Sequence, residues 1–597
     1  NETVVAGAEF GLYAKEDIHA HGEVIVKADT LLGKAVSDED GKAVFESDLP
    51  FGSYYIKELA APAGYVSSFE TLEVTAKYQG QDVKVVKLES VFKNQPTKVT
   101  FKKSDITTGV ELSGATLTVL DKDGNVVDTW KSVKGEEHLI ERLTAGETYT
   151  LREEMAPYGY LMAEEITFTV EDTVEIQKVE MKDAVPTGTL IINKKGEFLD
   201  KVSALDSVGG WIKHLFEYLS GSLKEVTFEV YALEDIKAAD GESEDYYKKD
   251  ALVATVTTDA DGYATVKNLP LGRYYVKEKN APDTYVLNTV PENVEFAYAD
   301  QDTAVIEKEI SVTDERQKVS ITVEKQDAET GNTVAGAVFG IYNAKDIQTK
   351  DGKVIVKADT LLQEMTSDKD GIASCTLDLP LGQYYVKELK APAGFVSSDE
   401  VLNLDASYQG QDVQTVTLKS VKKNQPTTVE ITKSDATTGV ELDGAYLKVT
   451  DKDGNVVDSW TSSKDAPHVI KYLKVGETYT LHEEFAPHGY LVANDVTFTV
   501  KDTGEVQKVE MKDEVPVGEL IINKKGEFLD SVTLADKVKG VVEHIFNYVT
   551  GKLTDVTFEV YAEEDIKAAD GVSDDYYKKD ELIATIKTDE TGIAKLE

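Results

Sequence analysis

The chain has 597 residues, 41% of them hydrophobic, with 64 Lys or Arg against 109 Asp or Glu and a net charge of -45. This length exceeds what one hydrophobic core supports, so several domains are expected. The negative charge excludes binding to nucleic acid or to an anionic membrane surface through charge. No apolar run approaches the length of a membrane span.

The chain repeats itself with a period of 330 residues, since LIINKKGEFLD at Leu190–Asp200 returns unchanged at Leu520–Asp530. Each period holds three related units, separated by short junctions near Pro96, Pro186, Gln317, Pro426 and Pro516. Such periodicity is typical of a linear array. We predict six units: A1 (1–96), B1 (97–185), C1 (186–317), A2 (318–425), B2 (426–515) and C2 (516–597). Because A1 begins inside its opening strand and C2 stops before its glutamate strand, we expect the array to continue beyond both.

Within the units, short runs of alternating apolar residues predict strands, for example Val99–Lys103 and Ile166–Val170. Asp-Gly pairs such as Asp123-Gly124 and Asp370-Gly371 predict hairpin turns between them. The acidic cluster at Asp121–Asn125 has its glycine in the wrong place for a calcium loop, so a turn is favoured over a metal site.

The C units carry an insertion whose apolar residues fit helical spacing. They are Trp211, Leu215, Phe216 and Leu219 in C1, matched by Val541, Ile545, Phe546 and Val549 in C2. A short helix is predicted in each. It would pack on its own unit, which is the favoured alternative, or form a contact surface for a neighbour.

Every unit except C2 contains a strand that ends in a glutamate before an Ala-Pro loop, as in LPLGQYYVKELKAPAGF at Leu379–Phe395. Side chains alternate between the faces of a strand, so this glutamate shares the apolar face. Burying a carboxylate there without a partner is costly, so its recurrence needs an explanation. The five residues are Glu58, Glu153, Glu278, Glu388 and Glu483.

A lysine and an acyl side chain recur at fixed places in the same units. A lysine ends the apolar face of the first strand, and an Asp or Asn ends that of the last strand. The complete sets are Lys103, Glu153, Asp183; Lys194, Glu278, Asp314; Lys325, Glu388, Asn424; and Lys433, Glu483, Asp513. The incomplete units A1 and C2 hold Glu58 with Asn94, and Lys524 alone. In C1 the neighbour Lys195 is an alternative, but strand phase favours Lys194.

If the first and last strands are neighbours, each set converges in a core. Burial favours a neutral amine and a protonated glutamic acid. A neutral amine is a nucleophile, and an acid beside the carboxyl or amide can polarise its carbonyl. The product would be a Lys–Asp or Lys–Asn isopeptide bond. The alternative is a buried salt bridge or a lysine that extends to solvent, but four sets in the same phase favour the bond.

These units resemble the collagen-adhesin B-type (CnaB, or SpaA-type pilin) domains of Gram-positive surface proteins. The resemblance rests on the opening Lys-x-Asp…Thr-Gly, seen at Lys325, Asp327, Thr330 and Gly331, on the Tyr-Tyr-Val-Lys-Glu-x-x-Ala-Pro motif and on the closing Asn or Asp. It covers the whole chain and is most specific for the A units. It implies tandem Ig-like, transthyretin-like β-sandwiches, each with an autocatalytic isopeptide bond for which the glutamate carries the proton.

We therefore predict an extracellular, cell-wall-anchored stalk segment of an adhesin or pilus, whose partners are further copies of the same repeat. The alternative is a module that binds a host matrix protein or glycan, but such a unit should be unique, and all three types are duplicated. An enzyme acting on an external substrate is not favoured, and no cofactor or metal is expected. Cys375, the single cysteine, is interpreted as a small strand side chain rather than a reactive thiol.

Overall fold

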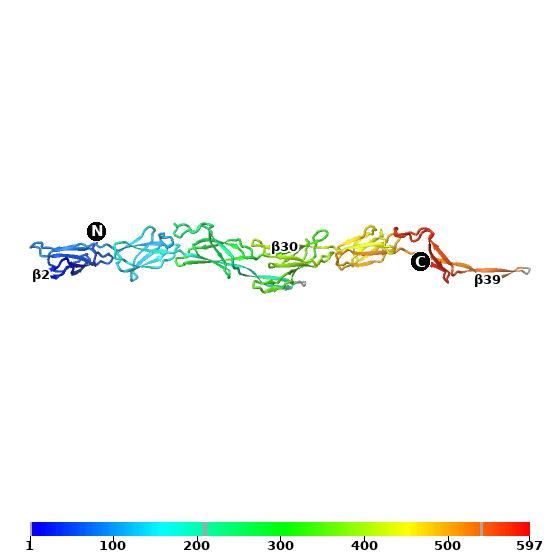
Figure 1. Ribbon diagram of the computed structural model, residues 1–597, viewed down its shortest axis with the longest axis horizontal. Coiled ribbons are helices and arrows are strands. Elements are labelled where there is room, and N and C mark those ends of the chain that lie inside the picture. The colour runs from blue at the N-terminus through cyan, green and yellow to red at the C-terminus, as the bar shows by residue number, and fades with distance from the viewer. Residues whose placement is uncertain (1–2, 207–211, 538–540) are drawn as a thin grey trace. The chain divides into compact units, whose positions relative to one another are not determined.

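The computed structural model describes residues 3–206, 212–537 and 541–597. Over these ranges the chain forms strands and loops, with no helix assigned (Figure 1), and the all-β prediction is confirmed. Consistently, no helix in the described ranges is long and apolar enough to cross a membrane. The chain divides into two compact parts, Asn1–Glu197 with Ser220–Arg316 and Gly410–Asp412, and Phe198–Leu219 with Gln317–Gln409 and Val413–Glu597. Each part is described by itself.

The first part holds A1, B1 and most of C1, each with at least one four-stranded sheet, while the segment Phe198–Leu219 of C1 belongs to the second part. A1 has the sheet β4 (Leu31–Val36), β1 (Glu9–Ala14), β5 (Gly52–Ala60) and β6 (Thr71–Ala76), with the ribbon β2 (Ile18–Ala20) and β3 (Glu23–Val26). B1 has β10 (His138–Glu141), β7 (Lys98–Asp105) and β13 (Gln177–Asp183), then β12 (Ile166–Thr169), β11 (Thr148–Met155), β8 (Thr116–Leu120) and β9 (Val126–Lys131). C1 has β15 (Ile212–Ser222), β14 (Thr187–Asp206), β18 (Tyr263–Leu269) and β21 (Val305–Asp314), then β17 (Leu252–Thr257), β16 (Thr227–Ala232), β19 (Gly272–Asn280) and β20 (Glu292–Phe296).

The second part repeats this plan. A2 has β27 (Ile372–Ser374), β22 (Lys318–Asp327) and β30 (Thr415–Asn424), then β26 (Leu361–Thr366), β23 (Val338–Asn343), β28 (Gly382–Lys390) and β29 (Leu402–Ala406), with the ribbon β24 (Ile347–Gln348) and β25 (Val354–Val356). B2 has β34 (His468–Lys471), β31 (Thr428–Asp435) and β37 (Gln507–Asp513), then β33 (Val456–Thr461), β32 (Tyr446–Thr450), β35 (Thr478–Phe485) and β36 (Val496–Thr499). C2 has the pairs β38 (Leu520–Asn523) with β43 (Ile593–Leu596), β39 (Lys525–Lys537) with β40 (Val541–Lys552), and β41 (Thr557–Tyr561) with β42 (Leu582–Lys587).

The first and last strands of B1, C1, A2 and B2 are hydrogen-bonded neighbours, and they run parallel. These pairs are β7 with β13, β14 with β21, β22 with β30, and β31 with β37. Parallel pairing requires a crossover, and here nearly the whole unit, including its second sheet, forms that connection. Because the strands are parallel, their carboxyl ends meet at one edge of the sheet, and the lysine and the acyl residue lie there.

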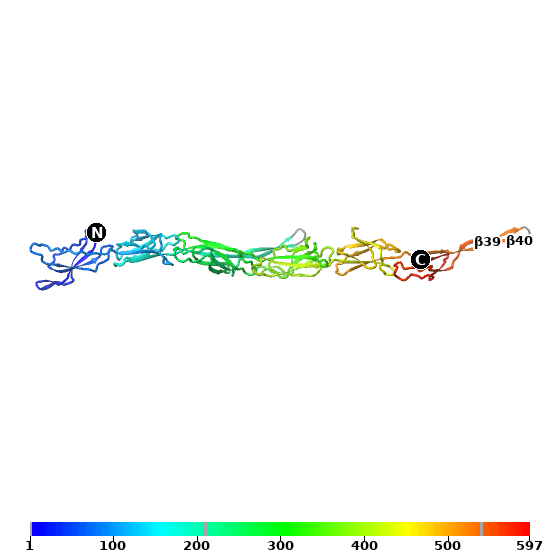
Figure 2. The same ribbon diagram turned by 90° about the horizontal axis from the view of Figure 1, so that it is seen from above.

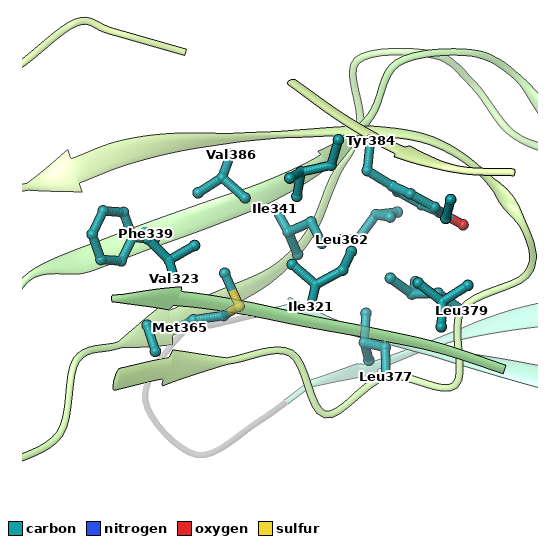
Figure 3. Close-up of a cluster of buried hydrophobic side chains, with 14 of the residues drawn as sticks. Ile321, Val323, Phe339, Ile341, Leu362, Met365, Leu377, Leu379, Tyr384 and Val386 are labelled. Carbon is teal, nitrogen blue, oxygen red and sulfur yellow. The ribbon is translucent and has the colours of Figure 1, made fainter. Parts of the chain in front are cut away.

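The core of A2 lies between its two sheets (Figure 3). Ile321 and Val323 of β22 meet Phe339 of β23 and Val386 of β28, and all four side chains are at most 1% exposed. Strand alternation directs these residues to one side of each sheet, as the period-2 pattern predicts. The glutamate and lysine of each set continue these same apolar faces.

The prediction of a helix in the C-unit insertion is wrong in the described residues. Leu215, Phe216 and Leu219 lie on strand β15, which pairs with β14 to form a long hairpin, and C2 has the equivalent pair β39 and β40 (Figure 2). Trp211 lies outside the described residues. Phe216 is 5% exposed and packs in the core cluster of A2, whereas Leu215 and Leu219, on the opposite face, are 43% and 59% exposed. Apolar residues on both faces of a hairpin imitate helical spacing. Phe216 therefore contacts the neighbouring unit, the alternative that the sequence did not favour.

Candidate functional site

In B1 three predicted residues meet in the core. Lys103 ends the apolar face of β7, Asp183 ends that of the parallel strand β13, and Glu153 comes from β11 in the facing sheet. The Lys103 ammonium contacts Asp183 Oδ1, and its Nζ lies 2.8 Å from Glu153 Oε1. The side chains of all three residues are fully buried. A lysine and two carboxyls are thus held together without solvent.

The same arrangement recurs in B2 and C1. Lys433 Nζ lies 2.9 Å from Glu483 Oε1 and contacts Asp513 Oδ1. In C1, Lys194 Nζ donates to Glu278 Oε2 at 2.8 Å and contacts Asp314 Oδ1. Lys194 is 0% exposed, so the structure places this lysine, rather than its half-buried neighbour, in the C1 site.

In each set the aspartate holds a buried oxygen that accepts no hydrogen bond, namely Asp183 Oδ2, Asp314 Oδ2 and Asp513 Oδ2. Glu278 Oε1 likewise accepts none, whereas Glu153 Oε1 and Glu483 Oε1 lie beside the lysine Nζ. An unsatisfied buried oxygen is costly. One proton shared between the glutamate and the aspartate would give each pair its missing hydrogen bond.

The acid–base properties of the sites agree with a shared proton. Burial raises the pKa of Asp183 to about 7 and that of Asp513 to about 6, although the adjacent lysine opposes the shift. Burial likewise raises the pKa of Glu278 to about 8. In all three cases the second carboxyl of the set raises the pKa further. Each dyad therefore holds a proton to a much higher pH than an exposed carboxyl does.

The Ala-Pro loop that follows each glutamate brings the chain back to hydrogen-bond the glutamate side chain. After the loop turns back, a backbone N–H ten residues downstream donates to the glutamate Oε2 in every unit that has this residue. The donors are Ser68 to Glu58 (2.7 Å), Ala163 to Glu153 (2.7 Å), Asn288 to Glu278 (3.4 Å), Ser398 to Glu388 (3.2 Å) and Ala493 to Glu483 (2.6 Å). This bond fixes Oε2. In B1 and B2 the lysine lies beside Oε1, whereas in C1 the lysine, and in A1 and A2 the asparagine, also donates to Oε2.

The asparagine site of A2 has a different geometry. Asn424 Nδ2 donates to Glu388 Oε2 at 2.5 Å and to the Val396 carbonyl at 2.9 Å. Lys325 is 0% exposed, and its Nζ donates to the Gln326 carbonyl at 3.0 Å, so within the described chain no hydrogen bond joins it to Asn424. Burial lowers the pKa of Lys325 and raises that of Glu388, which favours their neutral forms.

The residues of the incomplete units are placed as follows. In A1, Asn94 Nδ2 donates to Glu58 Oε2 at 2.9 Å, which reproduces the A2 contact. In C2, Lys524 lies between β38 and β39 and is half-buried. The structure thus brings together all three members in B1, C1 and B2, and the glutamate and asparagine in A1 and A2.

Sequence reasoning missed Lys422 of β30. Its side chain is 1% exposed, and its Nζ donates to Ser398 Oγ at 2.8 Å and to Glu400 Oε2 at 2.9 Å. It shares the face of Asn424, two residues later, where B1 and B2 have methionine. This spacing of two residues from Asn424 could have identified Lys422 as a core-facing lysine from the sequence alone. Lys422 thus hydrogen-bonds the loop that contains Ser398, whose backbone N–H in turn donates to Glu388.

The remaining candidates have structural roles. Asp121 accepts the backbone N–H groups of Asp123 and Asn125, as the predicted turn requires. A search of the described residues finds no group of three or more side chains able to hold a metal ion. Cys375 is half-buried and packs against the A2 core cluster.

Comparison with known proteins identifies the class to which these sandwiches belong. The family model of the SpaA prealbumin-like fold domain matches residues 1–89, 97–185, 219–312, 319–422 and 427–515. These segments make up more than half of the chain, so the chain belongs to the family of SpaA prealbumin-like fold domain proteins.

Individual relatives are distant. The chain is 29% identical over 128 residues to the trypsin-resistant surface T6 protein of Streptococcus pyogenes serotype M6, which covers 21% of this chain and 20% of that protein. The chain thus matches about a fifth of this relative's length. The Bacillus anthracis TIE protein is 21% identical, with 73% of this chain and 76% of that chain covered and a TM-score of 0.38. BcpA, the major pilin subunit of Bacillus cereus, is 16% identical, with 55% and 99% covered and a TM-score of 0.22.

Proposed function

We propose that B1, C1, A2 and B2 are four domains that each close an intramolecular isopeptide bond, and that the six predicted units form a stalk segment of a Gram-positive surface adhesin or pilus-like fibre. The observation that carries the proposal is the contact of a fully buried lysine ammonium with an aspartate Oδ1 in three separate cores. The membership of the chain in the SpaA family, among whose structural neighbours are pilin subunits, agrees with a surface role. The only chemistry proposed is this single-turnover crosslinking.

The proposed reaction is an acyl transfer. The lysine, deprotonated to a neutral amine, attacks Cγ of the aspartic acid, and an N–C bond replaces the C–O bond. The glutamic acid protonates the departing hydroxyl, which leaves as water, and takes up a proton from the amine. At Asn424 the C–N bond breaks instead and ammonia leaves. Holding the reactants in contact supplies a large effective molarity, and A2 needs a rotation of Lys325 away from the Gln326 carbonyl.

Intact-mass spectrometry tests the proposal. Each Asp site should lower the mass of the chain by about 18 Da and the Asn site by about 17 Da, because acyl transfer to an amine displaces water or ammonia. Digestion should yield branched peptides that join Lys103 to Asp183, Lys194 to Asp314, Lys325 to Asn424 and Lys433 to Asp513. A mass equal to that of the uncrosslinked chain would refute the proposal. If the three decreases of about 18 Da occur but the decrease of about 17 Da does not, A2 forms no bond.

Bond formation should slow as the pH rises. The reactive set holds one proton on its carboxyl dyad, and this proton is retained below the raised pKa and lost above it. Because burial raises the pKa of Asp513, Asp183 and Glu278 to between about 6 and about 8, the rates of B2, B1 and C1 should all fall over this range. The chain is produced in denatured form, so that no bond has yet formed, and is then transferred to folding buffers between pH 5.5 and 9. The measurement is the amount of each crosslinked peptide against time. Rates that rise together over this range would contradict the assigned role of the dyad.

A further inference from the structure

Two buried lysines lie side by side in A2. The parallel register of β22 and β30 pairs Lys325 with Lys422, and these residues are 0% and 1% exposed. Both side chains therefore enter the core from neighbouring strands. Two ammonium groups opposite each other in a sheet repel, and a buried site strengthens the repulsion. The second lysine thus needs a reason beyond packing.

The other units show that the fold does not require a lysine at this position. In B1, C1 and B2 the residue paired with the lysine of the set is Met181, Val312 and Met511, respectively. In A1 the residue that corresponds to Lys422 is Phe92. Apolar side chains thus fill the same place in four related units, where they avoid the cost of burying a charge.

Acceptors on one loop hold the Lys422 ammonium. Its Nζ donates to Ser398 Oγ at 2.8 Å, to the Glu400 carbonyl at 3.0 Å and to Glu400 Oε2 at 2.9 Å. Lys325 Nζ instead donates to the neutral Gln326 carbonyl. Because a carboxylate stabilises the charge of Lys422, Lys325 is the member of the pair that gives up its proton more easily.

The charges that face Lys325 act in opposite directions. Burial lowers the pKa of Lys325 and the charge of Lys422 lowers it further, whereas Glu388 of β28 and Asp327 of β22 raise it. Asp327 keeps its negative charge: burial opposes ionisation, but the hydrogen bond from the Tyr472 hydroxyl lowers the pKa of Asp327. Lys422 is therefore the cation that offsets these two carboxylates.

The loop that Lys422 holds also positions the other two reactants. The Ser398 N–H donates to Glu388 Oε2 at 3.2 Å, and the Val396 carbonyl accepts a hydrogen bond from Asn424 Nδ2 at 2.9 Å. Asn424 Nδ2 is the group that would leave as ammonia, and it donates to Glu388 Oε2 at 2.5 Å. The proton carrier thus lies beside the leaving group, and both are fixed by this loop.

We infer that Lys422 is a positioning residue for the bond of A2: its fixed charge favours the neutral, nucleophilic amine of Lys325, and its hydrogen bonds order the loop that holds Glu388 and Asn424. This inference rests on the proposed bond between Lys325 and Asn424. It assigns to A2 an activating cation that B1, C1 and B2 do not have at the paired position.

The pH dependence of bond formation in A2 tests the inference. The denatured, uncrosslinked chain is transferred to folding buffers of different pH, and the peptide that joins Lys325 to Asn424 is quantified against time. The reactive pair of Lys325 and Glu388 shares one proton, and, burial apart, the charge of Lys422 lowers the pKa of both groups. Lys422→Met should therefore move the rate profile of A2 to higher pH. It should also lower the maximal rate on the order of tenfold, because the loop is less ordered.

Three further variants separate the charge from the hydrogen bonds. Lys422→Arg keeps a cation and its donors and should keep the profile. Ser398→Ala removes one acceptor but no charge, so it should slow A2 without moving the profile. Lys423→Met, the matched control, removes a charge from the exposed face of β30 and should change neither quantity. In every variant the bonds of B1, C1 and B2 should form at their usual rates.

The possible failures can be told apart. If Lys422→Met slows A2 equally at every pH, changes nothing or prevents A2 from folding, Lys422 has no activating role and the inference is wrong. It is equally wrong if Lys422→Arg moves the profile as far as Lys422→Met does. If the unaltered chain never joins Lys325 to Asn424, the proposed bond of A2 fails, and this inference fails with it.

Discussion

Glu153→Gln should leave B1 without its crosslink and strongly destabilise this domain. The bond from Lys103 to Asp183 closes a loop over 80 residues, and the loop-entropy relation developed for disulfides gives about 4–5 kcal/mol for its loss. For a domain of this size that corresponds to a fall in Tm of roughly 20–35 °C. Glutamine keeps the shape of the side chain and an acceptor for the Ala163 N–H, but it cannot carry the proton.

The measurement combines intact mass with calorimetry of the full chain. The variant should regain about 18 Da and show one new, lower-temperature transition, while the other three sites stay crosslinked. Glu154→Gln, at the exposed neighbouring position, is the control and should change neither quantity. If Glu153→Gln retains the mass loss at Lys103 and Asp183, the glutamate is not the proton carrier.

Under mechanical load the difference should be larger still. Tension reaches B1 through β7 and leaves through β13, so a bond between these parallel strands carries the force past the rest of the domain. In single-molecule pulling the unaltered B1 should add no unfolding step. The Glu153→Gln domain should unfold and release its 80-residue loop, a gain of roughly 280 Å at about 3.5 Å per residue.

The second repeat supplies an internal control for this experiment. B2 keeps its own set of Lys433, Glu483 and Asp513 in the Glu153→Gln chain, so a single extra step is expected, and the double variant with Glu483→Gln should show two. The incomplete units A1 and C2 have no bond of their own and unfold in every variant, so an unaltered chain that yields a further step of this length would show that the load is not carried by the proposed bond.

The sequence predicted which residues converge in B1, because strand alternation is a strict geometric rule. Lys103, Glu153 and Asp183 each continue an apolar face, and any residue in that phase must enter the core. The rule failed for the insertion, because Leu215 and Phe216 lie on opposite faces of a hairpin, and no local pattern reveals that a neighbouring domain covers one of them. It also could not predict that Lys325 would turn to the Gln326 carbonyl, since a rotamer depends on the packed surroundings.

The parallel pairing of β7 with β13 has a consequence for the lifetime of the proposed fibre. Once Lys103 is bonded to Asp183, the covalent path along the chain bypasses every peptide bond in between. A protease that nicks a surface loop such as the turn at Asp123 and Gly124 would then cut B1 without separating the two pieces. Within this domain, separating the two pieces would require cleavage before Lys103 or in the few residues between Asp183 and the first strand of C1.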